Sequence, residues 1–243
     1  MNLIIDVGNT KVKLAIFSNQ KCIKKASASH ITFAQKIIKL KKQFPEIKRA
    51  IISSVGSVSI EDLEQLKNQF KLLILKSSTK IPFENCYETP STLGVDRIAL
   101  VSASVNKYSD KNVLIIDAGT CITYDFITND NKYLGGAISP GIRMRYNSLH
   151  NLTANLPLLD TKPPKNLIGN STNESIHSGI INGILKELDG IVSDYEKKYQ
   201  DLTVILTGGD TKFLSKQLKS SIFANSNFLL EGLNFILEFN KIE

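Results

Sequence analysis

The sequence predicts an α/β protein made of two related halves, two lobes that face each other across a central cleft. Residues 3–10 read Leu-Ile-Ile-Asp-Val-Gly-Asn-Thr and residues 114–121 read Leu-Ile-Ile-Asp-Ala-Gly-Thr-Cys, so one strand-and-turn motif occurs twice. In each half, alternating apolar residues predict two more strands directly after this motif. The 243 residues suffice for two lobes, which we place at 1–112 and 113–243. The alternative is a single domain in which the repeat has no structural meaning.

In the first half, the alternation predicts second and third strands at 12–17 and 21–26, with an Asn-Gln turn between them. Helical spacing of apolar residues and the short apolar runs between them predict the rest of this half. The predicted elements are, in order, a helix at 32–42, a strand at 50–54, a helix at 60–70, a strand at 72–75 and a helix at 93–108.

The second half repeats the three strands, at 114–117, 122–127 and 133–138, with a turn at 129–131. The remaining elements are predicted in this order: a helix after Pro140-Gly141, a long helix at 173–199, a strand at 203–206, a helix after Thr207-Gly208-Gly209-Asp210, a short strand near 228–230 and a terminal helix from Gly232. Residues 153–172 contain three prolines and form the one long irregular stretch, of a kind that is often functional.

Composition excludes several classes of protein. No run approaches the ~18 apolar residues of a membrane span, and the N-terminus lacks the basic and apolar regions of a secretory signal. Cys22, Cys86 and Cys121 are scattered without C-x-x-C spacing, which argues against a disulfide framework and a zinc site. We therefore expect a cytoplasmic protein with no membrane partner.

The net charge of +7 is unevenly distributed, because residues 1–112 hold 18 Lys and Arg against nine Asp and Glu. Such a basic half can bind nucleic acid or attract a multiply charged anion such as a nucleotide. The densest basic run, within 36–49, lies on and after the amphipathic helix predicted at 32–42 and is typical of a solvated helix face. No aromatic residues alternate with these lysines, so we expect no nucleic-acid partner.

The two Asp-x-Gly turns indicate phosphate and metal chemistry. A glycine lets the backbone approach closely, so that N–H groups of the turn can bind an anion. The carboxylate of Asp6 or Asp117 can then hold a metal ion beside the phosphates. One such turn is weak evidence, because Asp and Gly are common turn residues. Two copies at equivalent places of a repeat favour a phosphate site.

Polar and basic residues extend the first turn. Thr10 can donate its hydroxyl to a phosphate, and Lys11 and Lys13 share one face of the second strand. For Lys11 we favour a surface lysine without a role. The P-loop and the G-x-G-x-x-G fingerprint are both missing from the sequence, as are the G-x-S-x-G and H-E-x-x-H motifs.

A third group of residues lies at 87–97, where a proline-containing loop enters a helix. In the structural interpretation, Asp96 complements the helix dipole and Arg97 is a surface residue. In the functional interpretation, Asp96 accepts a proton from a substrate hydroxyl, while Arg97 and the helix N-terminus hold an acidic group of the substrate.

With these motifs assembled, nearly the whole chain resembles the type III pantothenate kinases, of the actin, sugar-kinase and heat-shock chaperone ATPase superfamily. The ordered set of motifs is more specific than any one of them. The matching motifs are D-x-G-N-T-x-x-K at 6–13, Y-x-x-P-x-x-L-G-x-D-R at 87–97, D-x-G-T at 117–120, Gly135-Gly136 with 138–141, Leu156-Pro157, Thr172 and T-G-G-D at 207–210.

The resemblance implies a duplicated ribonuclease-H-like (actin-like ATPase) fold and ATP-dependent phosphorylation of pantothenate to 4'-phosphopantothenate, the first step of coenzyme A biosynthesis. It also implies Mg²⁺, a monovalent cation (potassium or ammonium) and a homodimer. By this resemblance Asp96 is the proton acceptor, Thr120 contacts nucleotide phosphate and Asp117 helps to bind the monovalent cation. The phosphate loop comprises Asp6, Val7, Gly8, Asn9, Thr10, Lys11, Val12 and Lys13, with Asp6 near Mg²⁺, and the pantothenate pocket comprises Tyr87, Gly94, Val95, Asp96, Arg97 and Thr172.

Cys121 departs from the family, which usually has alanine after D-x-G-T, and an exposed thiol there would make the site sensitive to oxidation. Arg97 serves either the substrate carboxylate or the placement of Asp96. Two other functions stay open. One is a regulator that kept the fold and contacts DNA through its basic half, and the other is a different small-molecule kinase or a phosphatase of the same superfamily.

Overall fold

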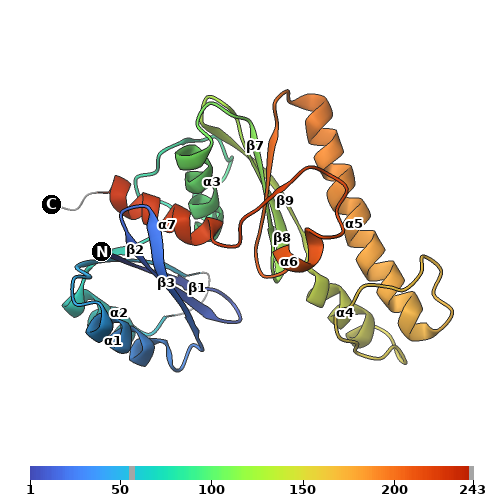
Figure 1. Ribbon diagram of the computed structural model, residues 1–243, viewed down its shortest axis with the longest axis horizontal. Coiled ribbons are helices and arrows are strands. Elements are labelled where there is room, and N and C mark those ends of the chain that lie inside the picture. The colour runs from blue at the N-terminus through green and yellow to red at the C-terminus, as the bar shows by residue number, and fades with distance from the viewer. Residues whose placement is uncertain (55–57, 241–243) are drawn as a thin grey trace. The chain divides into compact units, whose positions relative to one another are not determined.

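The computed structural model describes residues 1–54 and 58–240. Contacts between Cα atoms divide the chain into two compact units. The first comprises Met1–Ser109, Asn131–Tyr133 and Asn227–Glu243, and the second comprises Asp110–Asp130 and Leu134–Ser226. Figure 1 shows both units and labels their helices and several of their strands.

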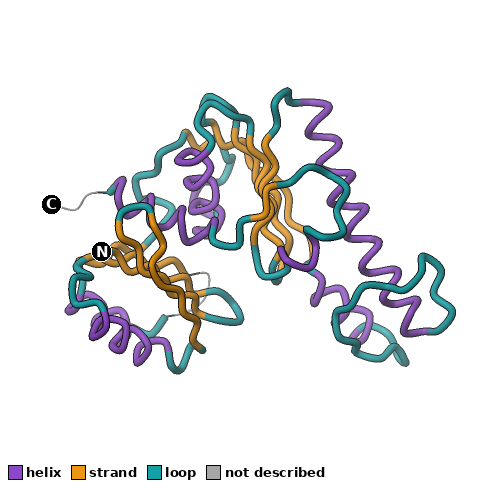
Figure 2. The backbone as a smooth tube through the Cα atoms, in the orientation of Figure 1, coloured by secondary structure: helices purple, strands orange, loops and turns teal. Residues whose placement is uncertain are grey.

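The first unit contains a five-stranded sheet, drawn in orange in Figure 2. Its strands are β1 (Asn2–Val7), β2 (Val12–Ser18), β3 (Lys21–Ala28), β4 (Arg49–Ser54) and β5 (Lys71–Ile74). Their order in the sheet is β3-β2-β1-β4-β5. Strands β1, β2 and β3 form an antiparallel meander, whereas β4 and β5 run parallel to β1. The meander turns at Asn19, whose φ of +52° places it in the left-handed region that asparagine tolerates.

Helices cover both faces of this sheet (Figure 1). They are α1 (Phe33–Gln43), α2 (Ile60–Gln69), α3 (Val95–Lys107) and α7 (Phe228–Phe239). Leu3 and Ile5 pack with α1 and α2 in one apolar cluster, and α3 and α7 contact β1 and β4 on the other face. The lysines of α1 at 36, 39 and 42 are exposed, which confirms the prediction of a solvated helix face.

The second unit repeats this topology. Its strands are β7 (Val113–Ala118), β8 (Cys121–Ile127), β9 (Lys132–Pro140), β10 (Thr203–Thr207) and β11 (Phe223–Ala224). The order β9-β8-β7-β10-β11 matches β3-β2-β1-β4-β5 strand for strand. Strand β8 is antiparallel to β7, and β10 and β11 run parallel to it, as in the first sheet. The predicted internal repeat is therefore confirmed as a duplicated fold.

Three helices belong to the second unit: α4 (Ile142–Asn151), α5 (Thr172–Lys198) and α6 (Thr211–Leu214). The apolar side of α5 packs on the sheet, where Ile181, Ile184 and Leu188 are fully buried with residues of β7, β8 and β10. The chain between α4 and α5 contains no helix or strand, which confirms the predicted irregular stretch.

Two short elements precede α3 in the first unit and were not predicted. Strand β6 (Glu84–Asn85) pairs in parallel with Lys132 and Tyr133 at the start of β9. A single 3₁₀ turn, η1 (Pro90–Thr92), follows it. Elements of two or three residues carry too little periodicity to be recognised from the sequence.

The predicted end of the chain is wrong in one respect. The strand expected near 228–230 is the first turn of α7, which begins at Phe228 and not at Gly232, and the short strand is β11 at 223–224. The apolar run that suggested a strand continues at helical spacing through Leu233 and Ile236, because α7 is buried along most of its length. In the structure α7 packs on α3, within the first unit, whereas the sequence halves place it in the second.

Close packing of these two helices requires a glycine. A Cβ at Gly232 would lie 1.9 Å from the carbonyl oxygen of Ala99 on α3. Within the described residues, none of the helices has the length and apolar character to cross a membrane.

Candidate functional site

Asp6 lies near the end of the central strand β1, and its side chain is only 9% exposed. Its direct partner on β2 is Lys13, whose Nζ lies 3.6 Å from Oδ2 of Asp6. Strand alternation explains this pair, because Val12 and Leu14 point into the core while Lys13 is half exposed. The first predicted turn therefore places a buried carboxylate beside a lysine that solvent can reach.

The electrostatics of Asp6 connect it with a second predicted residue. Burial raises the pKa of Asp6 from 3.8 to about 6, while the charge of Lys13 lowers it and the charge of Asp96 raises it again. Like charges raise a carboxyl pKa only at short range. Asp6, Lys13 and Asp96 therefore belong to one site within the first unit.

The turn between β1 and β2 is open to solvent. The N–H of Gly8 donates to the carbonyl of Lys11 at 3.2 Å, which closes the turn. Asn9, Thr10 and Lys11 are exposed at its tip. An exposed turn that begins with glycine is suited to contact an anion through its backbone and the Thr10 hydroxyl.

Asp96 lies in the first turn of α3, and its position depends on Gly94. The N–H of Arg97 donates to Oδ1 of Asp96 at 2.8 Å. A Cβ at Gly94 would lie 2.4 Å from the same oxygen, so the glycine leaves room for the carboxylate. The side chain is half buried at a helix N-terminus, where the dipole favours its charge.

Arg97 is buried, with 5% of its surface exposed, so the interpretation of Arg97 as a surface residue is wrong. Its guanidinium carbon lies 5.5 Å from the ring centre of Tyr87 and 5.9 Å from that of Tyr133. The two rings stack with their centres 6.1 Å apart. Cation–π attraction to both rings therefore holds the guanidinium in place.

Sequence reasoning missed Tyr133, because it is 46 residues from Tyr87 and its strand pattern does not separate it from any other buried tyrosine. It also missed the hydroxyl residues beside the two aspartates. Ser53 of β4 is the register partner of Asp6, and Thr207 of β10 is that of Asp117. Both are buried. The signal that could have found them is a strand ending in Ser or Thr at the same place in each repeat.

The second predicted turn, at 117–120, lies in the second unit and is enclosed by two glycine-bearing loops. Gly208 has φ +97°, and a Cβ there would lie 2.4 Å from Oδ1 of Asp117. On the other side, the N–H of Gly141 donates to the carbonyl of Thr120 at 3.1 Å. A Cβ at Gly141 would lie 2.2 Å from the carbonyl oxygen of Gly119. The Gly208 loop and the Gly141 loop therefore both pack against this turn. Thr120 is exposed at its tip.

A cavity of about 520 Å³ lies next to the Gly208 loop. Its lining combines a glycine, an aromatic ring and two lysines, which suits a planar anionic ligand. The sequence predicted none of these lining residues beyond the T-G-G-D motif. The lining residues are Pro163, Gly209, Lys212, Phe213, Lys216 and Gln217. Pro163 comes from the irregular stretch between α4 and α5.

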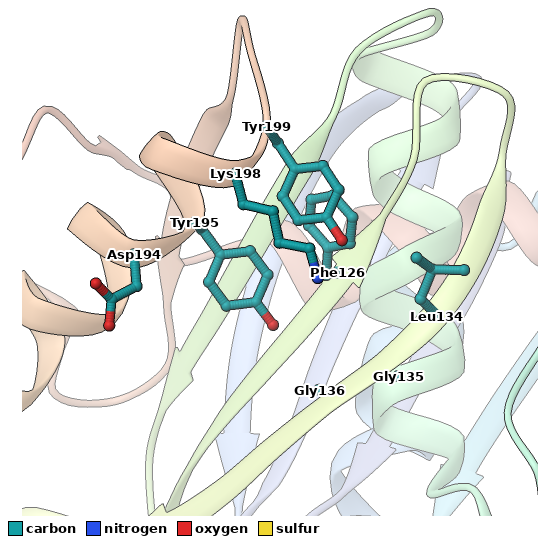
Figure 3. A pocket seen from close by; sticks show the side chains of 8 residues that line it. All are labelled: Phe126, Leu134, Gly135, Gly136, Asp194, Tyr195, Lys198 and Tyr199. Atoms are coloured by element: carbon teal, nitrogen blue, oxygen red, sulfur yellow. The ribbon is translucent and has the colours of Figure 1, made fainter.

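A smaller cavity of about 370 Å³ lies between β9 and the end of α5 (Figure 3). Phe126, Tyr195 and Tyr199 form one side, with the ring centres of Phe126 and Tyr199 4.1 Å apart. Gly135 and Gly136 of β9 also line it. This cavity contains none of the predicted site residues, so we do not count it as part of the candidate site.

The predicted residues thus fall into two groups. Asp6, Lys13, Tyr87, Asp96 and Arg97 lie together in the first unit. The second unit holds the others: Asp117 and Thr120 in the enclosed turn, Cys121 with a free, half-buried thiol and Thr172 exposed at the start of α5. That Thr172 completes a pocket with Tyr87 and Arg97 stays a prediction. Within 1–54 and 58–240, no group of three or more His, Cys, Asp and Glu forms a protein-only metal site.

Comparison with known proteins agrees with this geometry. The family model of the type III pantothenate kinases matches residues 2–194. A type III pantothenate kinase of Christiangramia forsetii is 57% identical over 243 residues, covering 100% of both chains.

Solved structures share the fold at low identity. A protein of Campylobacter jejuni described as a Baf family transcriptional activator has TM-score 0.65 and 22% identity, covering 98% of both chains. A glucokinase from an Antarctic psychrotroph has TM-score 0.55 and 13% identity, covering 98% of this chain and 99% of its own. The actin-like ATPase fold class is confirmed. From its full-length match to this family, the chain belongs to the type III pantothenate kinases, ATP-dependent enzymes that phosphorylate pantothenate in coenzyme A biosynthesis.

Proposed function

We propose that the chain converts pantothenate to 4'-phosphopantothenate with Asp96 as the proton acceptor and the 6–13 turn as the phosphate loop. The observation that carries this proposal is the effect of Asp96 on Asp6, because the negative charge of Asp96 raises the pKa of the Asp6 carboxyl beside Lys13. A kinase needs its acceptor-activating carboxylate beside its phosphate site. These two residues supply that combination within one unit.

On the phosphate side, Lys13, Thr10 and the turn amides would contact the triphosphate, and Thr120 would do so from the second turn. A Mg²⁺ ion fits Asp6, because Mg²⁺ is usually held by one or two carboxylates with water and substrate phosphates. A cation bound nearby would favour the charged form of this carboxyl, whose pKa burial raises to about 6. When bound, the ion would offset negative charge on the phosphates.

On the acceptor side, Asp96 would orient the primary hydroxyl of pantothenate and take its proton at a carboxylate oxygen. Arg97 would bind the pantothenate carboxylate, because an anion compensates the charge of a buried guanidinium that packs beside two tyrosine rings. Tyr87, Gly94 and Val95 would line the same pocket. Thr172 would line it too, and the pocket would be completed across a homodimer interface.

The nucleoside would occupy the cavity of about 520 Å³ beside Gly209. Phe213 offers an apolar surface to the base, and Lys212 and Lys216 attract the phosphates. Asp117 would help to hold a potassium or ammonium ion near the second turn, since hard cations prefer oxygen ligands.

A homodimer is supported by the exposed edge of β9. After Tyr133, the outer edge of β9 has no paired strand among the described residues, and Leu134 and Ile138 are 47% and 64% exposed. An exposed apolar sheet edge of this kind promotes aggregation unless another chain covers it. The cytoplasmic location predicted from the sequence stays a prediction, as do the lobe boundaries.

A regulator that contacts DNA is the main competing function, and the Campylobacter jejuni protein carries such a description. At 22% identity that likeness concerns the fold alone. Asp6, Lys13 and Asp96, which phosphoryl transfer would use, lie together in the first unit, which favours the kinase. The buried Arg97 favours an acceptor that carries an acid group, as pantothenate does.

One coupled assay of ADP release tests the proposal. We expect release only with pantothenate present, and a large loss of rate when sodium replaces potassium. Release that is independent of pantothenate would indicate another phosphotransfer reaction, and no release with any acceptor would favour a non-catalytic protein.

A further inference from the structure

The carboxylate of Glu187 on α5 accepts hydrogen bonds from three other elements of the second unit. The hydroxyl of Tyr124 on β8 donates to Oε1 at 2.8 Å, and that of Ser139 on β9 donates to the same oxygen at 2.6 Å. Arg145 on α4 donates through Nη2 to Oε2 at 2.5 Å. Three-quarters of the Glu187 side chain is shielded from solvent. Nothing in the proposed mechanism uses this residue.

This network leads directly to the second turn. Arg145 also donates through Nε to the carbonyl of Pro140 at 2.9 Å, so Glu187 and Arg145 together fix the residues just before Gly141. Gly141 in turn donates to the carbonyl of Thr120, with no space for a side chain between the two loops. A shift of the 139–141 segment therefore displaces the turn that carries Thr120.

The charge of Glu187 is stabilised where it lies. Burial raises the pKa of Glu187, but hydrogen bonds from Ser139, Arg145 and Tyr124 outweigh burial and hold it below its ordinary value. The carboxylate is therefore ionised at neutral pH and pairs with Arg145. Such charge-assisted hydrogen bonds are stronger and more directional than neutral ones.

We propose that Glu187 and Arg145 are positioning residues that hold the turn at 117–120 in the geometry that binds nucleotide phosphate. The proposal rests on the proposed function, in which Thr120 contacts the nucleotide. In metal sites, residues that orient the ligands without touching the metal typically contribute about 10-fold or more to affinity. We expect an effect of the same size here. Neither residue is among those assigned to the acceptor site, so we expect pantothenate binding to stay unchanged.

The test compares Glu187→Gln with the wild-type enzyme. Glutamine keeps the size and one acceptor oxygen, but its amide NH₂ group cannot accept the hydrogen bond that Arg145 donates to Oε2. We expect the Kd of the non-hydrolysable analogue AMP-PNP with Mg²⁺, measured by calorimetry, to rise about 10-fold. The KM for pantothenate should change less than about twofold. Arg145→Lys, which keeps the charge, should lose less affinity than Arg145→Met.

A matched control is Glu231→Gln. Glu231 pairs with Lys107 at 2.7 Å and is similarly shielded, but it belongs to the first unit and takes no part in the Glu187 network. We expect the Glu231→Gln variant to bind AMP-PNP with unchanged affinity. If Glu187→Gln does not fold, Ser139→Ala removes a single hydrogen bond and should still raise the Kd for AMP-PNP severalfold.

A double-mutant cycle separates positioning from general stability. In a Thr120→Ala background, the effect of Glu187→Gln on the Kd should shrink clearly, because both changes act through one turn. Unchanged nucleotide affinity in Glu187→Gln and Ser139→Ala, or full additivity in the cycle, would overturn the positioning role while leaving the kinase intact. If the wild-type protein itself binds no AMP-PNP, the proposed function fails and this inference with it.

Discussion

The ammonium nitrogen of Lys13 lies 3.6 Å from Oδ2 of Asp6, because the two residues are direct partners on the antiparallel strands β1 and β2. The lysine offsets only part of the cost of burying the carboxylate, since the pKa of Asp6 is still raised to about 6. Without nucleotide and metal, the charged form of Asp6 therefore lowers the free energy of unfolding.

Asp6→Asn should stabilise the free protein at alkaline pH. A carboxyl group with a raised pKa stabilises the fold fully below its unfolded value of 3.8, and this contribution is lost as the pH rises through about 6. The variant cannot ionise, so at pH 8 its free energy of unfolding should exceed the wild-type value, by at most about 3 kcal/mol. Urea unfolding without Mg²⁺ and nucleotide, at pH 5 and pH 8, measures the difference, which should be smaller at pH 5.

The exposed Asp194→Asn serves as the control for this measurement, since its side chain is 77% exposed and should change stability by less than about 0.5 kcal/mol. A less stable Asp6→Asn protein at pH 8 would show that the Lys13 pair outweighs burial. The same variant should bind Mg²⁺-nucleotide poorly. Asp6 would then serve nucleotide binding while it lowers the stability of the fold.

Gly94→Ala should lower turnover without unfolding the protein. The added Cβ would lie 2.4 Å from Oδ1 of Asp96, and the carboxylate, as a side-chain end, moves more easily than backbone. We expect kcat to fall about 10- to 100-fold while AMP-PNP affinity and thermal stability stay close to wild type. Steady-state kinetics with both substrates check this, and wild-type kcat would mean that Asp96 is free to move without consequence.

Asp117→Asn should reduce the response of the enzyme to potassium. Loss of the carboxylate removes the charged oxygen ligand that we assign to the monovalent cation. The ratio of rates in potassium and sodium should therefore fall towards one. An unchanged ratio would place the cation elsewhere.

Gly232→Ala should destabilise the first unit. Its Cβ would meet the Ala99 carbonyl at 1.9 Å, and because this is a backbone atom the helices α3 and α7 must separate. We expect a loss of about 1–3 kcal/mol in urea unfolding. Gly190→Ala on α5 is the matched control, with nothing within 4 Å of the new Cβ, and should be neutral or stabilising by up to about 1 kcal/mol. Equal stability of the two variants would contradict the packing described.

Local patterns were sufficient to predict the fold but not all of its contacts. The duplicated strand order follows from the repeat around Asp6 and Asp117, and α5 follows from its helical periodicity. The start of α7 was mispredicted because three apolar residues in a row, at 228–230, are too short a segment for periodicity to separate helix from strand.

The candidate site divides in the same way. Asp6 and Asp96 carry recognisable motifs, and the sequence located them. Tyr133 and Glu187 act through partners far away in the chain, 36 residues from Arg97 and 42 from Arg145. Only the three-dimensional structure brings such pairs together, because neither residue belongs to a local pattern.

Turnover of Asp96→Asn is the most direct test of the central claim that Asp96 accepts the proton of pantothenate. Asparagine keeps the shape but has no basic oxygen, so kcat should fall at least about 100-fold. The affinity for AMP-PNP with Mg²⁺ and the stability of the fold should match the wild-type values. Near-wild-type turnover in this variant would contradict the assignment of Asp96 as the base.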